Sequence, residues 1–212
     1  FPSDLTPARM IADRLHCPHY MIERRLPIEE TIGCMKELKA AGKVRFLGMS
    51  NLERELADRL LADGVLDIVQ YPYNMVNRTK EDVLKYYASQ GCGTMGYGSL
   101  GGGILTGQFR EVPTFGHGDM RASFYGPMFT EPGFSQIQAL LKVMDGIAEA
   151  HKATVAQVAI NWSLAHDYIH TVLTGVGNAA EAEENCAAAA WELTAQEKQA
   201  LDEAISKIHI YS

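Results

Sequence analysis

The residues best suited to chemistry in this sequence stand at the carboxyl ends of short apolar runs. They are polar or conformationally special, and each follows a stretch with the composition of a buried strand. The residues are His16, Ser50, Asn51, Gln70, Tyr97 and Gly175. Asn and Gln amides donate and accept hydrogen bonds, and a Tyr ring offers a flat surface for stacking. Such a set predicts a site for a polar small molecule, provided that the strands bring it together.

Helices alternate with these runs along the chain and must hold them in place. A helix is predicted over residues 27–41, because Pro27 suits a first turn and Gly42 can end the helix. Further helices are predicted over residues 52–63, 79–90, 135–152, 154–166, 178–190 and 194–208, and strands over residues 44–50, 67–71, 91–98 and 169–175. Between them, residues 101–133 form a long Gly- and Pro-rich segment, of a length that is usually functional or partly disordered.

Three of the helices carry sequence signals for their amino ends. Thr79 with Asp82 predicts a capping box, in which a hydroxyl and a carboxylate satisfy the first backbone N–H groups. Glu181 and Glu197 likewise stand three residues after the expected caps of the last two helices.

Strands that alternate with helices predict a parallel sheet, which a doubly wound fold and a (β/α)8 barrel both provide. A barrel builds its site from the carboxyl ends of several strands, whereas an open sheet uses one crevice. Because special residues end nearly every run here, the pattern favours the α/β class and a TIM barrel. We expect residues 1–212 to form a single barrel domain, apparently incomplete on its N-terminal side.

Four motifs occur in order and at suitable spacing, namely GKVRFLGMSN, DIVQYPYN, MGYGSLGGGILTG and LTGVGNAAEAEEN. Together they resemble the aldo-keto reductase family over most of residues 27–208. Members of that family are barrels that bind an extended NAD(P)H and reduce aldehydes or ketones without a metal. The resemblance therefore implies an oxidoreductase that acts on a small carbonyl substrate and has no metal site.

The resemblance also implies roles for individual residues. Ser50, Asn51 and Gln70 resemble the group that hydrogen-bonds the nicotinamide carboxamide, and Tyr97 resembles the ring on which the nicotinamide stacks. His16, in the stretch LHCP, resembles the family's His-x-Pro residue that orients the substrate carbonyl, and it is the catalytic candidate. The residues that resemble the pyrophosphate side are Ser99, Leu100, Gly102, Leu105 and Gly107, and those that resemble the adenosine side are Gly175, Glu184 and Asn185.

Each of these residues also has a purely structural interpretation. Asn51 would cap the following helix, Gln70 would satisfy a buried backbone group, and Tyr97 would pack in the core. Asp119 and Arg121, in the long segment, fit a solvated ion pair better than a ligand contact. The functional interpretation is favoured because the set is ordered along the chain and stands at strand ends.

The adenosine side departs from the family pattern in its charge. The expected position of an Arg that holds a 2′-phosphate, two residues after Gly175, is Gly177. Residues 174–185 contain no Lys or Arg, and three of them are acidic, Glu181, Glu183 and Glu184. A like-charge contact with a phosphate is unfavourable. We therefore expect NADP or NAD as the cofactor, with NADH bound at least as well as NADPH.

The resemblance fails for the proton donor. In the family this is a Tyr supported by a Lys and an Asp from the first third of the fold, and none of the three is recognisable here. A truncation would explain this, as would a sequence that closes over missing residues, in which case a chain break is expected between Ala8 and His16. The alternatives to an active reductase are a nucleotide-binding regulatory relative and an unrelated barrel lyase or isomerase.

The bulk composition narrows the partners. The 212 residues are 47% hydrophobic and 21% charged, with a formal charge of −7. This balance argues against nucleic acid and anionic membranes as partners, because both attract clustered positive charge. No apolar run is long enough to cross a membrane. The four cysteines, Cys17, Cys34, Cys92 and Cys186, are widely spaced, which predicts reduced thiols in the cytoplasm rather than a zinc or redox site.

Overall fold

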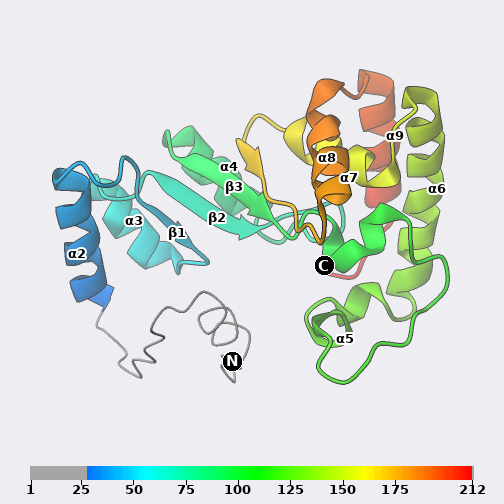
Figure 1. Ribbon diagram of the computed structural model, residues 1–212, viewed down its shortest axis with the longest axis horizontal. Coiled ribbons are helices and arrows are strands. Elements are labelled where there is room, and N and C mark those ends of the chain that lie inside the picture. The colour runs from blue at the N-terminus through cyan, green and yellow to red at the C-terminus, as the bar shows by residue number, and fades with distance from the viewer. Residues whose placement is uncertain (1–27, 212) are drawn as a thin grey trace. The chain divides into compact units, whose positions relative to one another are not determined.

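The computed structural model describes residues 28–211, and the chain divides into two compact units, Phe1–Val44 and Arg45–Ser212. The described part of the first unit contains helix α2, Ile28–Ala40, which confirms the helix predicted there (Figure 1). Its first turn carries Glu29 and Glu30 and its last turn Lys39, charges that complement the helix dipole. The strands and the remaining helices lie in the second unit.

The second unit is built on a parallel sheet of four strands (Figure 1). The strands are β1 Gly48–Ser50, β2 Ile68–Pro72, β3 Gly93–Tyr97 and β4 Thr171–Val172. They lie in the order β1-β2-β3-β4, so each strand pairs with its neighbour in the sequence. A doubly wound sheet reverses its strand order at a switch point, whereas a barrel adds strands in sequence. The four described strands follow the sequence order without a reversal, as a barrel requires.

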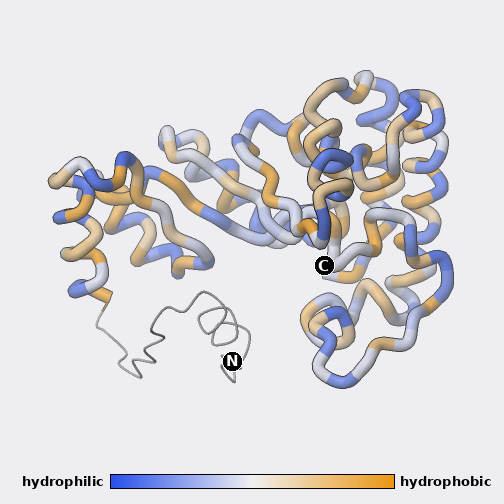
Figure 2. The backbone as a smooth tube through the Cα atoms, viewed as in Figure 1, coloured by the Kyte–Doolittle hydropathy of each residue, from blue (hydrophilic) through white to orange (hydrophobic). Residues whose placement is uncertain are grey.

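The two faces of this sheet differ in their environment. Along β2 and β3, Val69, Tyr71 and Thr94 are buried on the face that the helices cover. The residues between them in sequence lie on the opposite face and are half-buried. Register places Gln70 beside Ser50 on one side and beside Met95 on the other. In Figure 2 the β2 tube passes from hydrophobic at its amino end to hydrophilic further along the strand.

Helices pack on the buried face and on one another. They are α3 Arg54–Ala62, α4 Glu81–Ser89, α6 Gly133–His151, α7 Val155–Leu164, α8 Ala179–Ala187 and α9 Ala195–Ile205. Helix α7 lies between the sheet and helices α6, α8 and η3 (Ala188–Ala190), so its residues from Ala156 to Ser163 are all buried. Trp162 of this helix stacks on Tyr73, with 5.7 Å between ring centroids, and its indole N–H donates to Asp202.

Helix starts agree with the sequence signals in two of three cases. Thr194 and Glu197 form the full capping box at α9. At α8, Asn178 accepts from the Glu181 N–H, as expected of a cap. The box predicted for Thr79 and Asp82 is wrong, because α4 begins at Glu81 and the Thr79 hydroxyl donates to Asn77 Oδ1 at 2.8 Å instead.

The outer strands are shorter than predicted. β1 begins at Gly48 rather than at residue 44, and β4 holds two residues rather than seven. Both are edge strands of the described sheet, so each finds hydrogen-bonding partners on one side only. The residues that flank them continue in irregular backbone, which ends the ladder early.

The long segment after β3 is folded rather than structureless. It contains the 3-10 turns η1 Gly101–Thr106 and η2 Gly126–Met128 and the short helix α5 Met120–Ser123. Phe109, Phe115 and Phe129 contact one another edge to face, with centroids 4.9 to 6.0 Å apart. Arg121 lies over Phe115 at 4.6 Å and pairs with Asp119, which holds the pKa of that carboxyl down at about 2.

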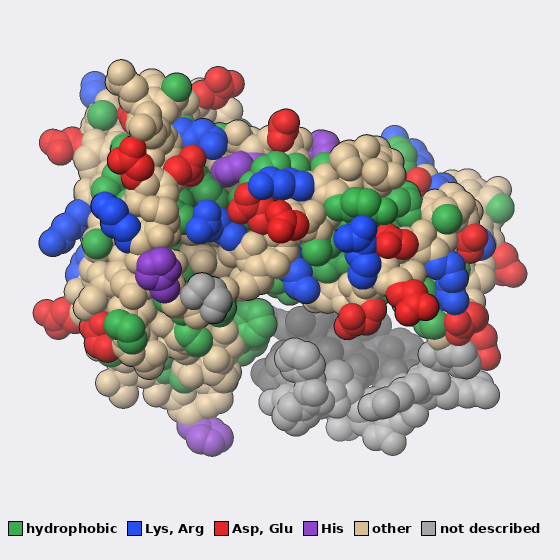
Figure 3. All heavy atoms as spheres, turned by 180° about the vertical axis from the view of Figure 1, so that it is seen from behind, with side chains coloured by type: hydrophobic (Ala, Val, Ile, Leu, Met, Phe, Trp, Pro, Cys, Tyr) green, Lys and Arg blue, Asp and Glu red, His purple; other side chains and the backbone are tan. Residues whose placement is uncertain are grey.

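Two further features are the distribution of charged side chains on the surface and the absence of a metal-ligand cluster among the described residues. On the face drawn in Figure 3, basic and acidic side chains are interspersed. Among residues 28–211, no helix is long and apolar enough to cross a membrane. The same residues contain no cluster of His, Cys, Asp and Glu with the geometry of a metal site.

Candidate functional site

The carboxyl ends of the first three strands bring four predicted residues together. Ser50 lies beside Gln70 in the register of β1 and β2. The Asn51 backbone N–H donates to the Gln70 carbonyl at 3.1 Å. The Tyr97 hydroxyl donates to Asn51 Oδ1 at 3.2 Å. These four residues therefore lie next to one another, and the set contains amide donors, amide acceptors and a half-exposed ring.

Asn51 has a backbone conformation that is unusual for a residue other than glycine. Its φ is 56°, in the left-handed region that Asn visits more readily than most residues. This turn directs the chain away from β1 immediately after Ser50, two residues before the N-cap Glu53 of α3. Because Glu53 is the cap residue, the interpretation of Asn51 as a helix cap is wrong.

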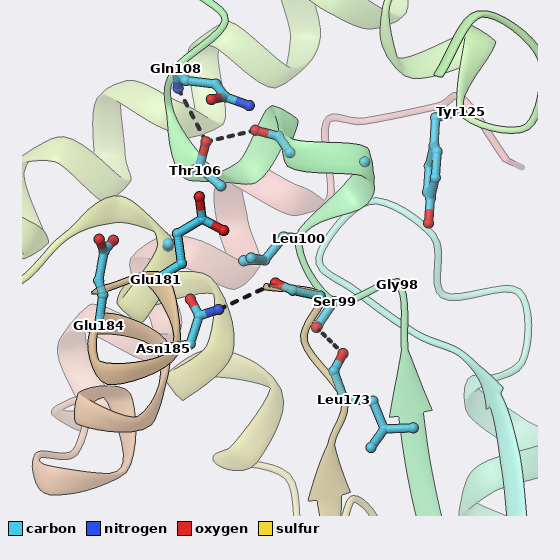
Figure 4. A pocket seen from close by; sticks show the side chains of 14 residues that line it. Gly98, Ser99, Leu100, Thr106, Gln108, Tyr125, Leu173, Glu181, Glu184 and Asn185 are labelled. Carbon is cyan, nitrogen blue, oxygen red and sulfur yellow. Dashed lines mark hydrogen bonds between the residues drawn. The ribbon is translucent and has the colours of Figure 1, made fainter. Parts of the chain in front are cut away.

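A pocket of about 450 Å³ begins where β3 ends. It lies between the glycine-rich turn after β3, the end of β4 and the first turns of α8 (Figure 4). Its size is that of an ordinary small-molecule site. The lining residues are Gly98, Ser99, Leu100, Gly102, Gly103, Thr106, Gln108, Tyr125, Ala156, Leu173, Gly175, Glu181, Glu184 and Asn185.

Two glycines of this turn are required by their surroundings. Gly98 and Gly102 have φ values of 67° and 68°, which other residues rarely adopt. A Cβ atom at Gly102 would also lie 2.7 Å from the Tyr125 ring. Ser99 is buried between them, and its hydroxyl donates to the Leu173 carbonyl at 2.7 Å, which ties the turn to the end of β4. The backbone of the turn is thus fixed in a shape that leaves it open to a ligand.

The α8 side of the pocket is polar and acidic. The Glu181 carboxylate accepts from the Gly177 N–H at 2.7 Å and from the Asn178 amide at 3.0 Å. It therefore occupies donors at the helix N-terminus that would otherwise attract an anion. Asn185 reaches the Gly175 carbonyl at 3.5 Å. No Lys or Arg is among the described residues that line the pocket.

The structure places the other predicted residues as follows. Six of the predicted nucleotide residues line the pocket, Ser99, Leu100, Gly102, Gly175, Glu184 and Asn185. Leu105 is fully buried in the core, outside the lining. Gly107 also lies outside it, in a left-handed conformation where a Cβ would meet the Arg110 guanidinium at 2.6 Å. The catalytic candidate His16, together with the chain break predicted before it, lies outside the described residues.

Sequence reasoning missed several pocket residues. Tyr125 belongs to the long segment, where no periodic pattern assigns a direction to its side chain. Burial raises the pKa of Tyr125, and the nearby Tyr97 phenol adds to the effect, so its hydroxyl is protonated at neutral pH. Thr106 and Gln108 follow the glycine turn directly, and that adjacency was the one sequence signal for them.

Comparison with known proteins decides the family. The model of the Aldo/keto reductase family matches residues 14–206 of this chain. The chain belongs to the aldo/keto reductase family. This membership excludes the hypothesis of an unrelated barrel lyase or isomerase, and it agrees with the sequential parallel sheet.

The chain matches individual members of the aldo/keto reductase family over only part of their length. It is 32% identical to Aldo-keto reductase YhdN of Bacillus subtilis (strain 168) over 188 residues, covering 88% of this chain and 55% of the relative. It is 28% identical to the NADH-specific methylglyoxal reductase of Escherichia coli (strain K12) over 165 residues, covering 76% of this chain and 49% of the relative. The chain thus spans about half the length of these curated relatives.

A solved structure of this family shares the fold. The glycerol dehydrogenase AKR11B4 from Gluconobacter oxydans superposes with a TM-score of 0.73 at 25% sequence identity. The match covers 98% of this chain and 64% of the dehydrogenase. The architecture is therefore that of an aldo/keto reductase (β/α)8 barrel, of which the four described strands form a consecutive part.

Proposed function

We propose that the protein containing this chain is an NAD(P)H-dependent oxidoreductase that reduces an aldehyde or ketone. The observation that carries the proposal is the direct continuity of two features. The polar and aromatic group at the strand ends finishes at Tyr97, and the glycine-lined pocket begins at the next residue, Gly98. A dinucleotide needs both, a flat polar site for its ring and an open backbone for its phosphates. When bound, the nucleotide supplies the hydride.

The chain's own residues orient the nicotinamide ring. Ser50, Asn51 and Gln70 present hydroxyl and amide groups at neighbouring strand ends, which suits a carboxamide with both donors and acceptors. Tyr97, half-exposed beside them, serves as the platform on which the ring stacks. A ring stacked on one face leaves the other face to the substrate, so hydride transfer is stereospecific.

The remainder of the nucleotide lies along the pocket. Backbone N–H groups of the turn from Gly98 to Gly103 are proposed to approach the pyrophosphate where glycines leave side chains absent, except those of Gly101 and Gly103, which already donate to carbonyls inside the turn. Glu184 and Asn185 line the α8 side, toward the adenosine end. Leu105 and Gly107 are proposed to support the conformation of this turn without contacting the nucleotide, since both lie outside the pocket lining.

The charge of the α8 side supports binding of NADH at least as well as NADPH. A 2′-phosphate at this end would face Glu181 and Glu184 without a Lys or Arg from the described lining residues. The Glu181 carboxylate already holds the Gly177 N–H at the start of α8. An uncharged ribose hydroxyl pays no like-charge penalty there. Relatives of both kinds exist, since one is named an NADH-specific methylglyoxal reductase and another carries NADP(+) in its name, so the charge of the α8 side is what carries this proposal.

The substrate belongs to the class of small carbonyl compounds. His16 is the residue proposed to orient the carbonyl, on the basis of its His-x-Pro resemblance. The proton donor is proposed to come from a segment other than those described.

The described cysteines, Cys34, Cys92 and Cys186, are free, which supports a reducing compartment such as the cytoplasm.

Two titrations of the whole protein test this function. NADH and NADPH are titrated separately by fluorescence at one ionic strength, and reduction of a small aldehyde is then followed by the loss of reduced nicotinamide. We expect both nucleotides to bind, with NADH at least comparable, and the aldehyde to be reduced. A preference for NADPH of about tenfold, equivalent to about 1.4 kcal/mol, would contradict the cofactor argument. Nucleotide binding without any reduction would instead support a regulatory, nucleotide-binding protein.

A further inference from the structure

Tyr125 forms one wall of the pocket, although it lies far from the glycine turn in the sequence. Its ring packs against the backbone of Gly102, where a Cβ would lie 2.7 Å from the ring. Its hydroxyl lies beside Gly98, where a Cβ would be 3.1 Å from the oxygen. Because neither glycine has a side chain, both leave room for the Tyr125 side chain. Figure 4 shows the ring standing at the edge of the turn with its hydroxyl end directed toward Gly98.

The segment that carries Tyr125 is anchored on both sides, so the ring is held in place before any ligand binds. On one side, Asp119 caps α5 and pairs with Arg121, which lies over Phe115. On the other side, the Met128 N–H donates to the Tyr125 carbonyl at 2.8 Å, and Met128 is buried against the glycine turn. A side chain fixed in this way loses little conformational entropy when it contacts a ligand.

The Tyr125 hydroxyl has hydrogen-bonding capacity to spare. It forms no hydrogen bond with the other pocket side chains drawn in Figure 4, and it is not among the buried polar atoms that lack a partner. It is therefore accessible from the pocket and free to donate. The acidic residues of α8 lie across the pocket from it, so the two sides address different parts of a ligand.

We propose that Tyr125 is a ligand-contact residue whose hydroxyl donates to an anionic or hydroxyl oxygen of the sugar–phosphate on the nicotinamide side of the nucleotide. The side is set by Gly98, which follows the Tyr97 platform directly and lies next to the hydroxyl. Its ring closes the glycine turn on the side away from α8. This inference rests on the proposed function, since it assigns a further residue to the same nucleotide site.

The test compares nucleotide binding in variants of the whole protein. Tyr125→Phe keeps the ring packed on Gly102 and removes only the hydroxyl. We expect it to weaken NADH binding about tenfold, the effect of losing one hydrogen bond to a charged oxygen. Tyr125→Ala should weaken it further, because the wall is lost as well. Val112→Ala is the matched control, since Val112 is a 53% exposed apolar side chain of the same long segment and does not line the pocket.

A fragment of the nucleotide separates the two ends of the pocket. AMP carries the adenosine end alone, so Tyr125→Phe should leave the affinity for AMP within about twofold of the unsubstituted protein. Equal NADH affinity in the Phe variant would overturn the proposed contact, and an equal loss for AMP would overturn its placement. If the unsubstituted protein bound neither NADH nor NADPH, the proposed function itself would fail, which is a distinguishable result.

Discussion

At the scale of single residues, the site depends on where Tyr97 places its ring. The ring lies on the half-buried face of β3, and its hydroxyl is held by Asn51 from the adjacent strand end. This hydrogen bond restrains the orientation of the half-buried ring. In its proposed role as a platform, the ring would contribute to binding through stacked area rather than through a charge.

Replacing Tyr97 by Ala should therefore weaken NADH binding by about 1–2 kcal/mol and leave the fold intact. The affinity is measured by fluorescence titration, and the fold is checked by the denaturant midpoint. Phe46→Ala is a suitable control, because Phe46 is a 64% exposed ring that does not line the pocket. Unchanged NADH affinity in a folded Tyr97→Ala variant would reduce Tyr97 to a packing residue.

A second residue, Glu181, is proposed to set the cofactor preference. Glu181→Gln removes one negative charge from the pocket while keeping an oxygen that can accept from the Gly177 N–H. We expect the affinity for NADPH to rise relative to that for NADH by about 0.5–1 kcal/mol, the range of a partly exposed charge interaction. Glu183→Gln, an exposed change on the same helix but outside the pocket, should leave the ratio unchanged. A ratio that moves equally in both variants would point to overall charge rather than to Glu181.

At the scale of secondary-structure elements, the amino ends of the helices hold the C-terminal part of the second unit in place. Thr194 and Glu197 close the first turn of α9, and Glu197 also accepts from His151 of α6 at 2.8 Å when that ring N carries its proton. Partial burial acts to raise the pKa of Glu197, but the bonds from Thr194 and His151 outweigh it and keep the pKa below its usual value. The cap therefore links two helices that lie side by side in the core.

Thr194→Ala should lower the free energy of unfolding by about 1 kcal/mol near neutral pH, because it removes the cap hydroxyl. A carboxyl group whose pKa is lower in the folded than in the unfolded protein stabilises the fold at pH values above its unfolded-state pKa. That stabilisation is lost as the pH falls through the lowered, folded-state pKa. The difference between the two proteins should therefore narrow in acid. Urea unfolding at several pH values measures it, with the exposed Gln196→Ala as a control expected within about 0.5 kcal/mol. A difference that grows in acid would contradict the role of the Glu197 carboxylate.

At the scale of the whole molecule, we propose that residues 1–212 behave as one domain. The described chain divides into two compact units, with α2 in one and the sheet in the other. Both tryptophans, Trp162 and Trp191, belong to the second unit, whereas the exposed, free Cys34 lies on α2. Each unit therefore carries its own probe for unfolding.

One cooperative transition is the expected result. A fluorophore on Cys34, with the exposed Cys186 and Cys17, which lies outside the described residues, both replaced by Ser, should report the same urea midpoint as tryptophan fluorescence. Coincident curves from two probes are the standard sign of two-state unfolding. A Cys34 signal that melts at clearly lower urea would show that the chain unfolds as two independent domains.

Much of this molecule was determined by the sequence alone. The alternation of helices and apolar runs predicted a parallel sheet, and special residues at the run ends predicted a site at one edge. Both follow from local patterns, since periodicity sets which face of an element is buried and an apolar run marks where a buried strand lies. The capping box at Thr194 was predictable for the same reason, because it involves residues three positions apart.

What the sequence could not determine depends on contacts between distant residues. The strand lengths of β1 and β4 were overestimated, because pairing on a single side ends a ladder that composition would continue. The position of Tyr125 depends on the edge-to-face contact of its ring with Phe124 and on two distant glycines that make room for it. These arrangements were decided by tertiary structure, because close packing, unlike periodicity, is not a property of any local stretch of chain.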